Sequence, residues 1–303
     1  RSPACGHGTR PLLPLSPRVR KTGQMTERKI PARVFAHAAQ DAETAKKTLS
    51  TPQTESPSYK LAFQDDDFLL REDLRPVRFQ LELLKPELLL DEAKIKSTLV
   101  FYGSARIPEP GVQSTHPDPE IAANLEALSP HYAEARKLAK IASRIPRDDD
   151  GWRHFVVCSG GGPSIMEAAN RGANDVLADS IGLNIVLPHE QVPNLFITPE
   201  LSFQFHYFAL RKMHFLLRAR AVAVFPGGFG TFDETFELLT LIQTGKIKPI
   251  PVILFGKEFW EDVVDFKALV KHGVIAEKDL QLFHYVSTAE EAWDCIREFY
   301  ETD

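Results

Sequence analysis

The stretch AVAVFPGGFGTFDE, residues 221–234, decides how this sequence folds. Its first residues are apolar and partly β-branched, which is typical of a buried strand, and the glycines that follow end the strand. From Phe232 to residue 243 the apolar residues have the spacing of a helix. The stretch therefore predicts a strand, a glycine turn and a helix in succession.

Five further apolar runs of the same character follow along the chain from residue 98 onward. They are TLVFYGS (98–104), HFVVCSG (154–160), GLNIVLP (182–188), PVILFG (251–256) and a weaker run near FHYVS (283–287). Helical patterns lie between them, over residues 131–143, 164–178, 204–218, 258–270 and 289–300. Runs that are apolar on both faces and alternate with helices indicate a parallel sheet covered on both sides. We therefore expect a doubly wound, Rossmann-like α/β fold with helices on both faces and right-handed crossovers.

Three of the predicted strands end in turns that contain glycine. These turns are GSAR (103–106), SGGGPS (159–164) and PGGFGT (226–231). In a doubly wound fold they lie at one edge of the sheet, where glycines let backbone N–H groups approach an anion and a helix N-terminus adds partial positive charge. Together they predict a phosphate site, although a single such turn is more often a tight connection without a ligand. No GxxxxGK[ST] loop occurs and GSAR is not GxGxxG, which argues against ATP hydrolysis and ordinary NAD chemistry.

Two glutamates follow these turns at the spacing of a capping box. Ser164 with Glu167, and Thr231 with Glu234, both fit the pattern S/T-x-x-E, in which the two side chains satisfy the first free N–H groups of a helix. We favour that structural explanation for Glu167. For Glu234 a chemical role is equally open, because a carboxylate beside an anion site is electrostatically unfavourable unless a reaction uses it.

The N-terminal region differs from the rest of the chain in charge. Residues 1–60 hold 11 Lys and Arg against 4 Asp and Glu, whereas the whole chain has a formal net charge of -5. This Pro- and Ser-rich segment has no sustained apolar period, so we expect a disordered basic tail. Two explanations of residues 1–24 stay open: they belong to the native chain, or they lie upstream of a start at Met25.

The next segments carry the folded part of the chain. Residues 61–96 contain apolar residues at helical spacings interrupted by Pro76 and Pro86, which predicts an N-terminal extension of short amphipathic helices. They are expected to pack on the domain or on a partner subunit. Residues 97–303 form the predicted Rossmann-like domain.

The composition excludes several classes of protein. Hydrophobic residues make up 43% and charged residues 25%, as in ordinary globular proteins, and no apolar run is long enough to span a bilayer. Cys5, Cys158 and Cys295 match neither a disulfide framework nor a zinc site, and His206 and His214 are too far apart along a helix to share a metal. We expect a cytoplasmic protein without metal or cofactor that does not bind membranes, and nucleic-acid binding by the tail is less favoured than a solvated arm.

Four features of the predicted domain together resemble a known family. They are Gly103-Ser104, the run SGGGPSIMEAANRGA (159–173), Arg211-Lys212 and PGGFGTFDE (226–234). The combination is similar to the Lonely Guy (LOG) family of nucleotide phosphoribohydrolases, long labelled lysine decarboxylases, and to its longer, type II-like bacterial and AMP nucleosidase-like members. The resemblance covers residues 66–300, and the PGGxGT run with an upstream Arg-Lys is its most specific part.

The resemblance implies a reaction and a catalytic pair. The family hydrolyses the N-glycosidic bond of a nucleoside 5′-monophosphate, either AMP or an N6-modified cytokinin riboside monophosphate, to free base and ribose 5-phosphate without a cofactor. Its motif arginine and the last glutamate of PGGxGTxxE correspond to Arg211 and Glu234. Asp233 stands where the family usually has a first glutamate, which leaves the role of that carboxylate open. Members of the family form homodimers or larger homo-oligomers.

The remaining candidate residues are expected to surround the substrate. The residues assigned to its phosphate and ribose are Gly103, Ser104, Gly227, Gly228, Gly230 and Thr231. The residues assigned to its base and ribose are Gly160, Gly161, Gly162, Met166 and Lys212. Glu234 would stabilise an oxocarbenium-like transition state or activate water, and Arg211 would orient Glu234 or contact the ribose and phosphate.

Two other functions compete with this hypothesis. A non-catalytic nucleotide or cofactor carrier on the same fold would bind such a ligand without cleaving it. The presence of both Arg211 and Glu234 favours the enzyme over the carrier. A pyridoxal-phosphate decarboxylase, which the old family label suggests, has little support because Lys212 would have to form an internal aldimine.

Overall fold

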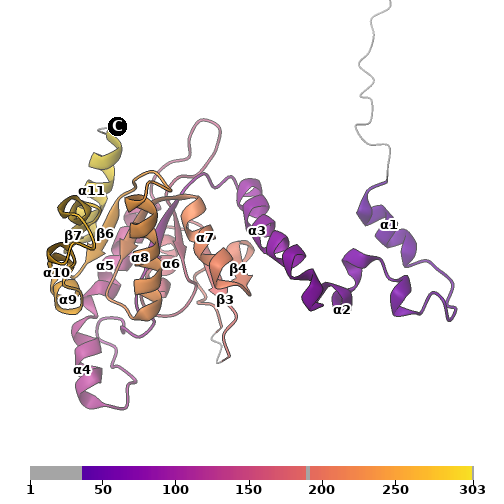
Figure 1. Cartoon of the computed structure of the whole chain (residues 1–303), viewed down its shortest axis with the longest axis horizontal. Coiled ribbons are helices and arrows are strands. Elements are labelled where there is room, and N and C mark those ends of the chain that lie inside the picture. The colour runs from indigo at the N-terminus through magenta and orange to yellow at the C-terminus, as the bar shows by residue number, and fades with distance from the viewer. Residues whose placement is uncertain (1–35, 189–191, 302–303) are drawn as a thin grey trace, which may run out of the picture. The chain divides into compact units, whose positions relative to one another are not determined.

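The computed structural model describes residues 36–188 and 192–301, and the chain divides into two compact units between Asp66 and Asp67 (Figure 1). The described part of the first unit contains helix α1 (Ala38–Ala45) and the 3-10 turns Pro57–Tyr59 and Ala62–Gln64. Residues 1–35 of the basic tail predicted over residues 1–60 lie outside the described residues, so their disorder stays a prediction, whereas the described residues 36–60 include α1.

The described part of the second unit contains a seven-stranded sheet in the order β4-β3-β2-β1-β5-β6-β7, and each neighbouring pair of strands is parallel. The strands are β1 (Thr98–Tyr102), β2 (Val156–Ser159), β3 (Ser180–Ile185), β4 (Ser202–Phe205), β5 (Ala219–Val224), β6 (Val252–Phe255) and β7 (His284–Val286). The strand order reverses between β1 and β5, and open α/β sheets bind ligands outside the carboxyl ends of the strands at such a point. The predicted doubly wound α/β fold is confirmed.

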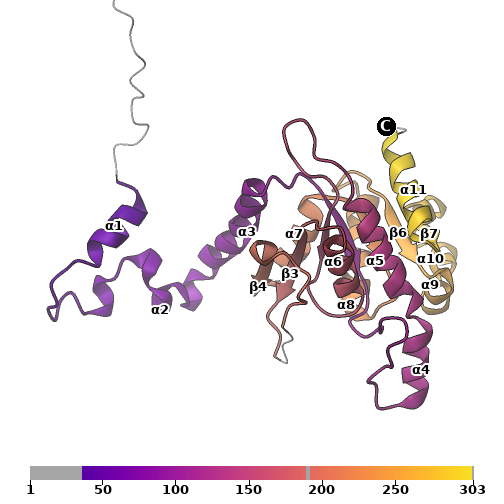
Figure 2. The same ribbon diagram turned by 180° about the vertical axis from the view of Figure 1, so that it is seen from behind.

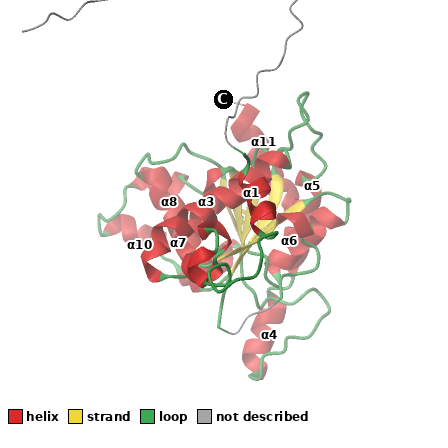
Figure 3. Cartoon of the chain, turned by 90° about the vertical axis from the view of Figure 1, so that its right-hand side faces the viewer, coloured by secondary structure: helices red, strands yellow, loops and turns green. Residues whose placement is uncertain are grey.

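Helices cover both faces of this sheet (Figure 3). The helices from residue 66 onward are α2 (Asp66–Leu69), α3 (Arg75–Glu92), α4 (Pro119–Ala127), α5 (Pro130–Ala142), α6 (Ile165–Asn174), α7 (Phe208–Leu217), α8 (Phe229–Gln243), α9 (Lys257–Val263), α10 (Phe266–Lys271) and α11 (Ala289–Glu301). Helices α3, α7, α8, α9 and α10 contribute to the core on one face, and α5, α6 and α11 contribute to the core on the other.

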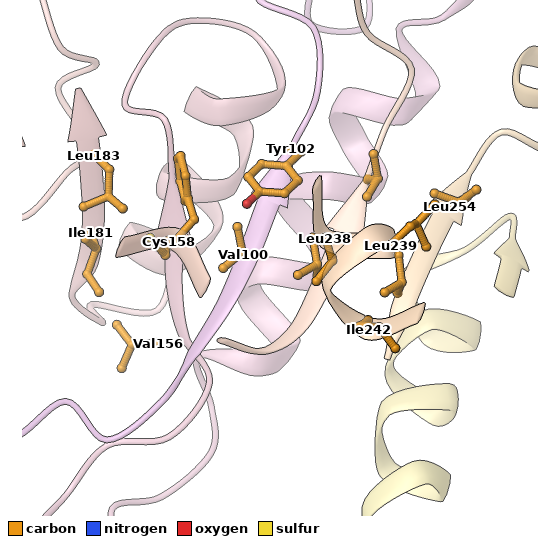
Figure 4. Close-up of a cluster of buried hydrophobic side chains, with 14 of the residues drawn as sticks. Val100, Tyr102, Val156, Cys158, Ile181, Leu183, Leu238, Leu239, Ile242 and Leu254 are labelled. Atoms are coloured by element: carbon orange, nitrogen blue, oxygen red, sulfur yellow. The ribbon is translucent and has the colours of Figure 1, made fainter. Parts of the chain in front are cut away.

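The central strand β1 shows why the sequence produces this arrangement. All five of its residues are buried, and its side chains alternate between the two cores, as the two-residue period of a strand requires. Val100 and Tyr102 belong to one core, whereas Leu99 and Phe101 belong to the other. Figure 4 shows the first core, where Val100 and Tyr102 lie in one cluster with Leu238 of α8.

The segment predicted as one helix over residues 204–218 is a strand followed by a helix, so that prediction was wrong in its first turn. Strand β4 ends at Phe205 and α7 begins at Phe208. Phe203 and Phe205 are buried while the residues between and before them are exposed, which is the alternation of a strand with one covered face. The aromatic residues of this segment fit both a helical and a strand period, so spacing alone does not separate the two.

Local capping explains two other differences from the expected helices. The helix predicted over residues 258–270 is two helices, because Asp265 accepts a hydrogen bond from Ala268 N at 2.8 Å and so begins α10 separately from α9. Helix α4 was not predicted at all. Asp118 caps it by accepting hydrogen bonds from the backbone N–H groups of Glu120 and Ile121.

Helix α3 runs without a break from Arg75 to Glu92, although Pro76 and Pro86 were expected to divide it. Pro76 lies in the first turn, where a missing N–H costs nothing. Pro86 lies inside the helix and has no N–H to donate to the carbonyl of Glu82. His214 Nε2 of α7 donates a hydrogen bond to that carbonyl at 3.1 Å. Packing against α7 therefore satisfies the backbone group that the proline leaves free.

None of the described helices is long and apolar enough to cross a lipid bilayer.

Candidate functional site

The structure brings together Arg211 and Glu234, which the sequence analysis assigned as a catalytic pair. Arg211 belongs to α7 and Glu234 to α8, and Arg211 Nη1 lies 3.1 Å from Glu234 Oε1. Their side chains are 10% and 13% exposed. The two charges are therefore paired in a setting with little water, where their mutual interaction is stronger than at the surface.

The guanidinium group of Arg211 is held by three further contacts. Its Nε donates a hydrogen bond to the carbonyl of Leu183 at the end of β3, at 2.7 Å. Its plane lies over the ring of Phe215, with 5.0 Å between the guanidinium carbon and the ring centroid. Its Nη2 lies so close to Gly160 that a Cβ there would be 2.6 Å away. Lysine has neither the planar shape nor the separate donors for these contacts.

Glu234 has the environment of a proton-transfer group. Burial raises the pKa of Glu234 to about 7, against the opposing effect of the Arg211 guanidinium. A carboxyl with such a pKa is present in both protonation states near neutral pH, which suits a general acid or base. Burial raises the pKa of the neighbouring Tyr102, and the Glu234 carboxylate raises it further.

The glycine turn after β2 is fixed by a buried network of amide side chains. Ser159 Oγ donates to Asn170 Oδ1 at 2.7 Å, and Asn194 Nδ2 donates to the same oxygen at 2.9 Å and to the carbonyl of Gly162 at 3.0 Å. The backbone N–H of Asn194 donates to the carbonyl of Gly161 at 2.9 Å. These bonds hold the turn in one conformation, and Gly160 of this turn contacts Arg211.

The glycine turn after β5 leads directly into α8. Gly228 is the N-cap residue of this 15-residue helix, and no side chain caps it. A Cβ at Gly228 or Gly230 would meet no atom within 4 Å, whereas one at Gly227 would lie 2.2 Å from Thr231 Oγ1. The first N–H groups of α8 therefore lie beside open space, which is the arrangement that binds anions at helix N-termini.

The turn after β1 is joined to the other two turns. Ser104 N donates to the carbonyl of Pro226 at 3.0 Å, and the carbonyl of Ser104 accepts a hydrogen bond from Ile165 N at 3.3 Å. A Cβ at Gly103 would lie 2.6 Å from the Ile165 side chain. Gly103 is therefore explained by packing against α6, and Ser104 connects the turns that precede α6 and α8.

The two predicted capping boxes do not form. Ser164 is the N-cap residue of α6, but its Oγ donates to the carbonyl of Ile107 at 2.6 Å and caps no helical N–H. Glu167 accepts a hydrogen bond from the Tyr132 hydroxyl at 3.0 Å. Thr231 lies inside α8 and is not its cap, so Glu234 is free to pair with Arg211.

Lys212 and Met166, which the sequence analysis placed near the base and ribose, lie in different surroundings. Lys212 Nζ pairs with Asp233 at 3.1 Å and with Glu237 at 2.8 Å, and these carboxylates raise its pKa. Asp233 thus has a salt-bridge partner of its own. Met166 lies beside Gly160, because a Cβ there would be 2.8 Å from the Met166 sulfur.

Sequence reasoning missed several groups that build this site. The carbonyl of Leu183 and the ring of Phe215 position Arg211, and Asn170 and Asn194 hold the glycine turn. A backbone carbonyl leaves no signal in a sequence. Asn170 does leave one, since a polar amide within the small-residue run AANRGA is unusual on a buried helix face, whereas Asn194 lies in a loop and leaves none.

Other parts of the described structure offer less for catalysis. In residues 36–188 and 192–301, no group of three or more His, Cys, Asp or Glu side chains lies close enough together to hold a metal ion. A pocket of about 490 Å³ lies between α5 and α11 and is lined by Phe155, Trp293 and Tyr300 among others. Phe155 directly precedes β2, so this pocket is at the amino ends of the strands, away from Arg211 and Glu234.

Comparison with known protein families bears on the part of the chain that holds the candidate pair Arg211 and Glu234. Residues 166–296 match the family described as "Possible lysine decarboxylase". That description is the label long carried by the LOG family, so the match supports the family resemblance. The matched region includes both Arg211 and Glu234. No curated protein matches the chain.

Solved structures with a similar fold were also found. One is protein TM1055, a structural-genomics target, which is 19% identical over 67% of this chain and 99% of its own, with a TM-score of 0.43. Another is the molybdenum cofactor binding protein of the phototrophic bacterium Rippkaea orientalis, at 17% identity over 67% and 98% of the two chains and a TM-score of 0.40. A third is the molybdenum cofactor carrier protein of Chlamydomonas reinhardtii, at 16% identity over 68% and 99%, with a TM-score of 0.41.

Proposed function

We propose that this protein hydrolyses the N-glycosidic bond of a nucleoside 5′-monophosphate, AMP or an N6-modified adenosine monophosphate, to free base and ribose 5-phosphate. The observation that carries this proposal is the buried pair of Arg211 and Glu234, in which burial raises the pKa of Glu234 to about 7. The resemblance to LOG phosphoribohydrolases, in which the corresponding residues are catalytic, supports it.

The 5′-phosphate is assigned to the N-terminus of α8. The first helical hydrogen bond of α8 runs from Phe232 N to the carbonyl of Gly228, so the preceding N–H groups have no partner within the helix. Gly228 and Gly230 leave room for phosphate oxygens to approach that backbone. Binding the phosphate there uses interactions remote from the reacting bond to fix the ribose relative to Glu234.

Glu234 is assigned the central chemical role. Cleavage of the bond between the anomeric carbon and the base nitrogen builds positive charge on the ribose, which an ionised carboxylate stabilises. Water adds its oxygen to the anomeric carbon as the bond to the base breaks, Glu234 takes a proton from that water, and the departing base nitrogen takes a proton from solvent. Arg211 fixes the carboxylate through Nη1 and is itself fixed by Leu183 and Phe215.

The direct test is release of free base from a nucleotide. Purified protein is incubated without added metal with AMP and, separately, with N6-isopentenyl-adenosine monophosphate, and free base is measured by chromatography. We expect Glu234→Gln and Arg211→Ala to lower the rate by about 100-fold to 10,000-fold, the range typical of a lost proton-transfer group. Glu237→Gln, on the same helix but paired with Lys212, is the matched control and should retain activity.

The same experiment separates the enzyme from a carrier and identifies the preferred base. Wild-type protein that binds AMP in calorimetry but releases no base would overturn the hydrolase proposal in favour of a carrier. If base is released, the ratio of kcat/KM for the two substrates separates nucleotide salvage from cytokinin activation.

The pKa of Glu234 predicts opposite pH effects on activity and stability. If ionised Glu234 is the base, kcat/KM rises with pH through about 7, and the rise is absent in Glu234→Gln. The folded chain holds this proton more tightly than the unfolded chain, whose carboxyl has an ordinary pKa near 4.5. The free energy of unfolding contributed by Glu234 therefore falls as pH rises between these values. Urea denaturation at pH 5 and pH 8 checks this, and an equal pH dependence in Glu234→Gln would contradict it.

Two coarser expectations accompany this proposal. Self-association, as in the LOG family, stays a prediction, as does a reducing, cytoplasmic setting. Among the described residues Cys158 and Cys295 are free thiols, which is compatible with that setting.

A further inference from the structure

A pocket between α5 and α11 lies outside the candidate site and takes no part in the proposed reaction. The two helices pack side by side on the face of the sheet that also holds α6 (Figure 2). The pocket has a volume of about 490 Å³. Ligand pockets commonly measure about 300–1,000 Å³, and a cavity of about 150 Å³ already holds benzene. This pocket therefore has room for a molecule with one or two rings and a short polar chain.

Three aromatic rings line one part of the pocket, and we call them the aromatic wall. Trp293 and Tyr300 lie seven residues apart on α11, and Phe155 directly precedes β2. The Phe155 ring meets the Trp293 ring at 81° with centroids 5.6 Å apart, and it meets the Tyr300 ring at 67° with centroids 5.9 Å apart. All three side chains are only partly buried, so they can contact a further ring. The aromatic wall therefore suits a molecule that contains an aromatic ring.

Two residues of the aromatic wall are fixed by hydrogen bonds within the chain. Phe155 has φ +52°, a left-handed backbone conformation that bulky residues rarely adopt, and its N–H donates to Ser97 Oγ at 3.1 Å. The Tyr300 hydroxyl donates to the carbonyl of Arg220. Backbone strain of this kind concentrates at sites that bind or react. Because the wall is already formed, a ligand does not have to order it.

The pocket also contains charged and polar groups that the described residues leave without partners. Arg144 and Glu301 both line it, and neither side chain forms a hydrogen bond or an ion pair with a described residue. Trp293 Nε1 likewise donates to no acceptor among them. Arg297 lines the pocket too, but it pairs with Asp294 at 2.5 Å. The carboxylate of Asp294 and, more weakly, that of Glu301 raise the pKa of Arg297.

The charges indicate what kind of molecule fits. A cation and an anion that both lack an ion pair favour a molecule that carries both charges, because a singly charged molecule would pair with only one of them. Arg144 and Glu301 are exposed, whereas the aromatic wall is partly buried. The charged end of such a molecule therefore lies at the rim of the pocket, and its ring lies inside.

We propose that this pocket binds an aromatic amino acid, with its ring on the aromatic wall, its carboxylate on Arg144 and its ammonium group on Glu301. The planar guanidinium group of arginine matches a carboxylate through two parallel hydrogen bonds. The ammonium group donates to the Glu301 carboxylate, and Trp293 Nε1 is a further donor for the ligand carboxylate. The proposal does not depend on the proposed hydrolysis, and its tests measure binding without any nucleotide.

The first test varies the ligand. The full chain is titrated by calorimetry with L-phenylalanine, with 3-phenylpropionate, which lacks the ammonium group, and with phenethylamine, which lacks the carboxylate. We expect L-phenylalanine to bind and each analogue to bind about tenfold more weakly, as for the loss of a hydrogen bond to a charged group. L-Leucine should also bind more weakly, because it has no ring for the aromatic wall. No binding of L-phenylalanine up to about 10 mM would overturn the proposal.

The second test pairs each charged residue with the ligand group that it contacts. Arg144→Gln should weaken L-phenylalanine about tenfold and leave phenethylamine unchanged, whereas Glu301→Gln should weaken L-phenylalanine but not 3-phenylpropionate. Both residues are exposed, so both variants should fold normally, which circular dichroism checks. Arg147→Gln, at an exposed arginine that does not line the pocket, is the matched control. Variants that weaken all ligands equally, or none, would contradict the assignment of the two charges.

The third test locates the bound molecule. Binding of L-phenylalanine should change the intrinsic fluorescence of the wild-type chain, and Trp293→Phe, which keeps a ring in the wall, should lose most of that change although Trp152 and Trp260 remain. Arg211→Ala should bind L-phenylalanine as the wild type does. An unchanged signal in Trp293→Phe, or lost binding in Arg211→Ala, would place the ligand elsewhere and overturn the proposal. Displacement of L-phenylalanine by adenine in Arg211→Ala would show that the pocket prefers a neutral base, and the proposal would fail.

Discussion

The glycine turns after β2 and after β5 resemble each other in sequence, but the space beside them differs. A Cβ at Gly160 would lie 2.6 Å from Arg211, and one at Gly161 would lie 2.1 Å from the side chain of Asn184. A Cβ at Gly228 or Gly230 would meet no atom within 4 Å. The first turn therefore needs glycine because the protein's own side chains fill the space, whereas the second turn leaves the space free at Gly228 and Gly230.

The difference separates two uses of the same residue type. The turn after β2 positions a catalytic candidate, since Gly160 lets Arg211 lie against the backbone. The turn after β5 exposes the first N–H groups of α8 to whatever binds there. Substitutions at the two turns should accordingly change different quantities.

Among substitutions at the two turns, the largest effect is expected from Gly160→Ala. The added methyl group overlaps the position of Arg211 Nη2, and moving a positioned group by about 1 Å costs on the order of 100-fold in rate. We expect kcat for base release to fall by that factor with little change in KM, and a scanning calorimetry trace should show that the protein stays folded. Activity near that of the wild type would mean that the position of Arg211 is unimportant.

Gly161→Ala should instead act on stability. Gly161 has φ +76°, which an alanine adopts at a cost of about 1–2 kcal/mol, and the methyl group would also clash with Asn184. We expect the free energy of unfolding to fall by about 2 kcal/mol or more in urea denaturation. Gly273→Ala is the matched control, because Gly273 has φ +73° but open space beside it. Equal losses in the two variants would show that the contact with Asn184 contributes nothing.

Asn194→Ala tests the network that holds the turn after β2. It removes the hydrogen bonds from Asn194 Nδ2 to the Gly162 carbonyl and to Asn170 Oδ1, so the Gly162 carbonyl loses this donor while Asn170 Oδ1 keeps the hydrogen bond from Ser159 Oγ. The expected loss in the free energy of unfolding is about 1–3 kcal/mol, measured by urea denaturation. Asn194→Asp keeps the shape but removes the donor, so it should be destabilised similarly. A neutral result for both variants would rule out a role of the network in stability.

The smallest effect on stability is expected from Gly230→Ala, at the second turn. Gly230 lies in the first turn of α8 beside open space, so alanine should stabilise the fold by about 0.5 kcal/mol. If phosphate approaches this backbone, KM for AMP should rise although the protein is more stable. An unchanged KM would show that the phosphate does not approach the backbone at Gly230.

The sequence predicted the fold class because the strands are buried on both faces. Six of the seven strands were found from their apolar runs, and α5 and α11 were predicted to within a residue at either end. Strand β4 was missed because Phe203 and Phe205 share their aromatic character with the helix that follows. The continuity of α3 through Pro86 was missed because the compensating donor, His214, lies far away in the sequence.

The sequence analysis named Arg211 and Glu234 as candidates, but it could not give their arrangement. Arg211 and Glu234 are 23 residues apart, and the placement of α7 and α8 on the same face of the sheet brings Arg211 Nη1 to 3.1 Å from Glu234 Oε1. Burial, which raises the pKa of Glu234, is a property of that packing and leaves no mark in the local sequence. The capping boxes failed for the same reason, because Tyr132 and Arg211 compete for the two glutamates.

Pro86 has a consequence for how α3 can move. A helix without proline presents the same backbone hydrogen-bonding groups to its neighbour after it slides by one turn. Pro86 removes that equivalence, because the Glu82 carbonyl in the interior of α3 lacks its usual helical donor and accepts a hydrogen bond from His214 Nε2 instead. Sliding by one turn would leave both the Glu82 carbonyl and the His214 Nε2–H without this hydrogen bond. Pro86 therefore fixes the axial position of α3 on α7. This requires the His214 imidazole to carry its proton on Nε2, where it donates to the Glu82 carbonyl.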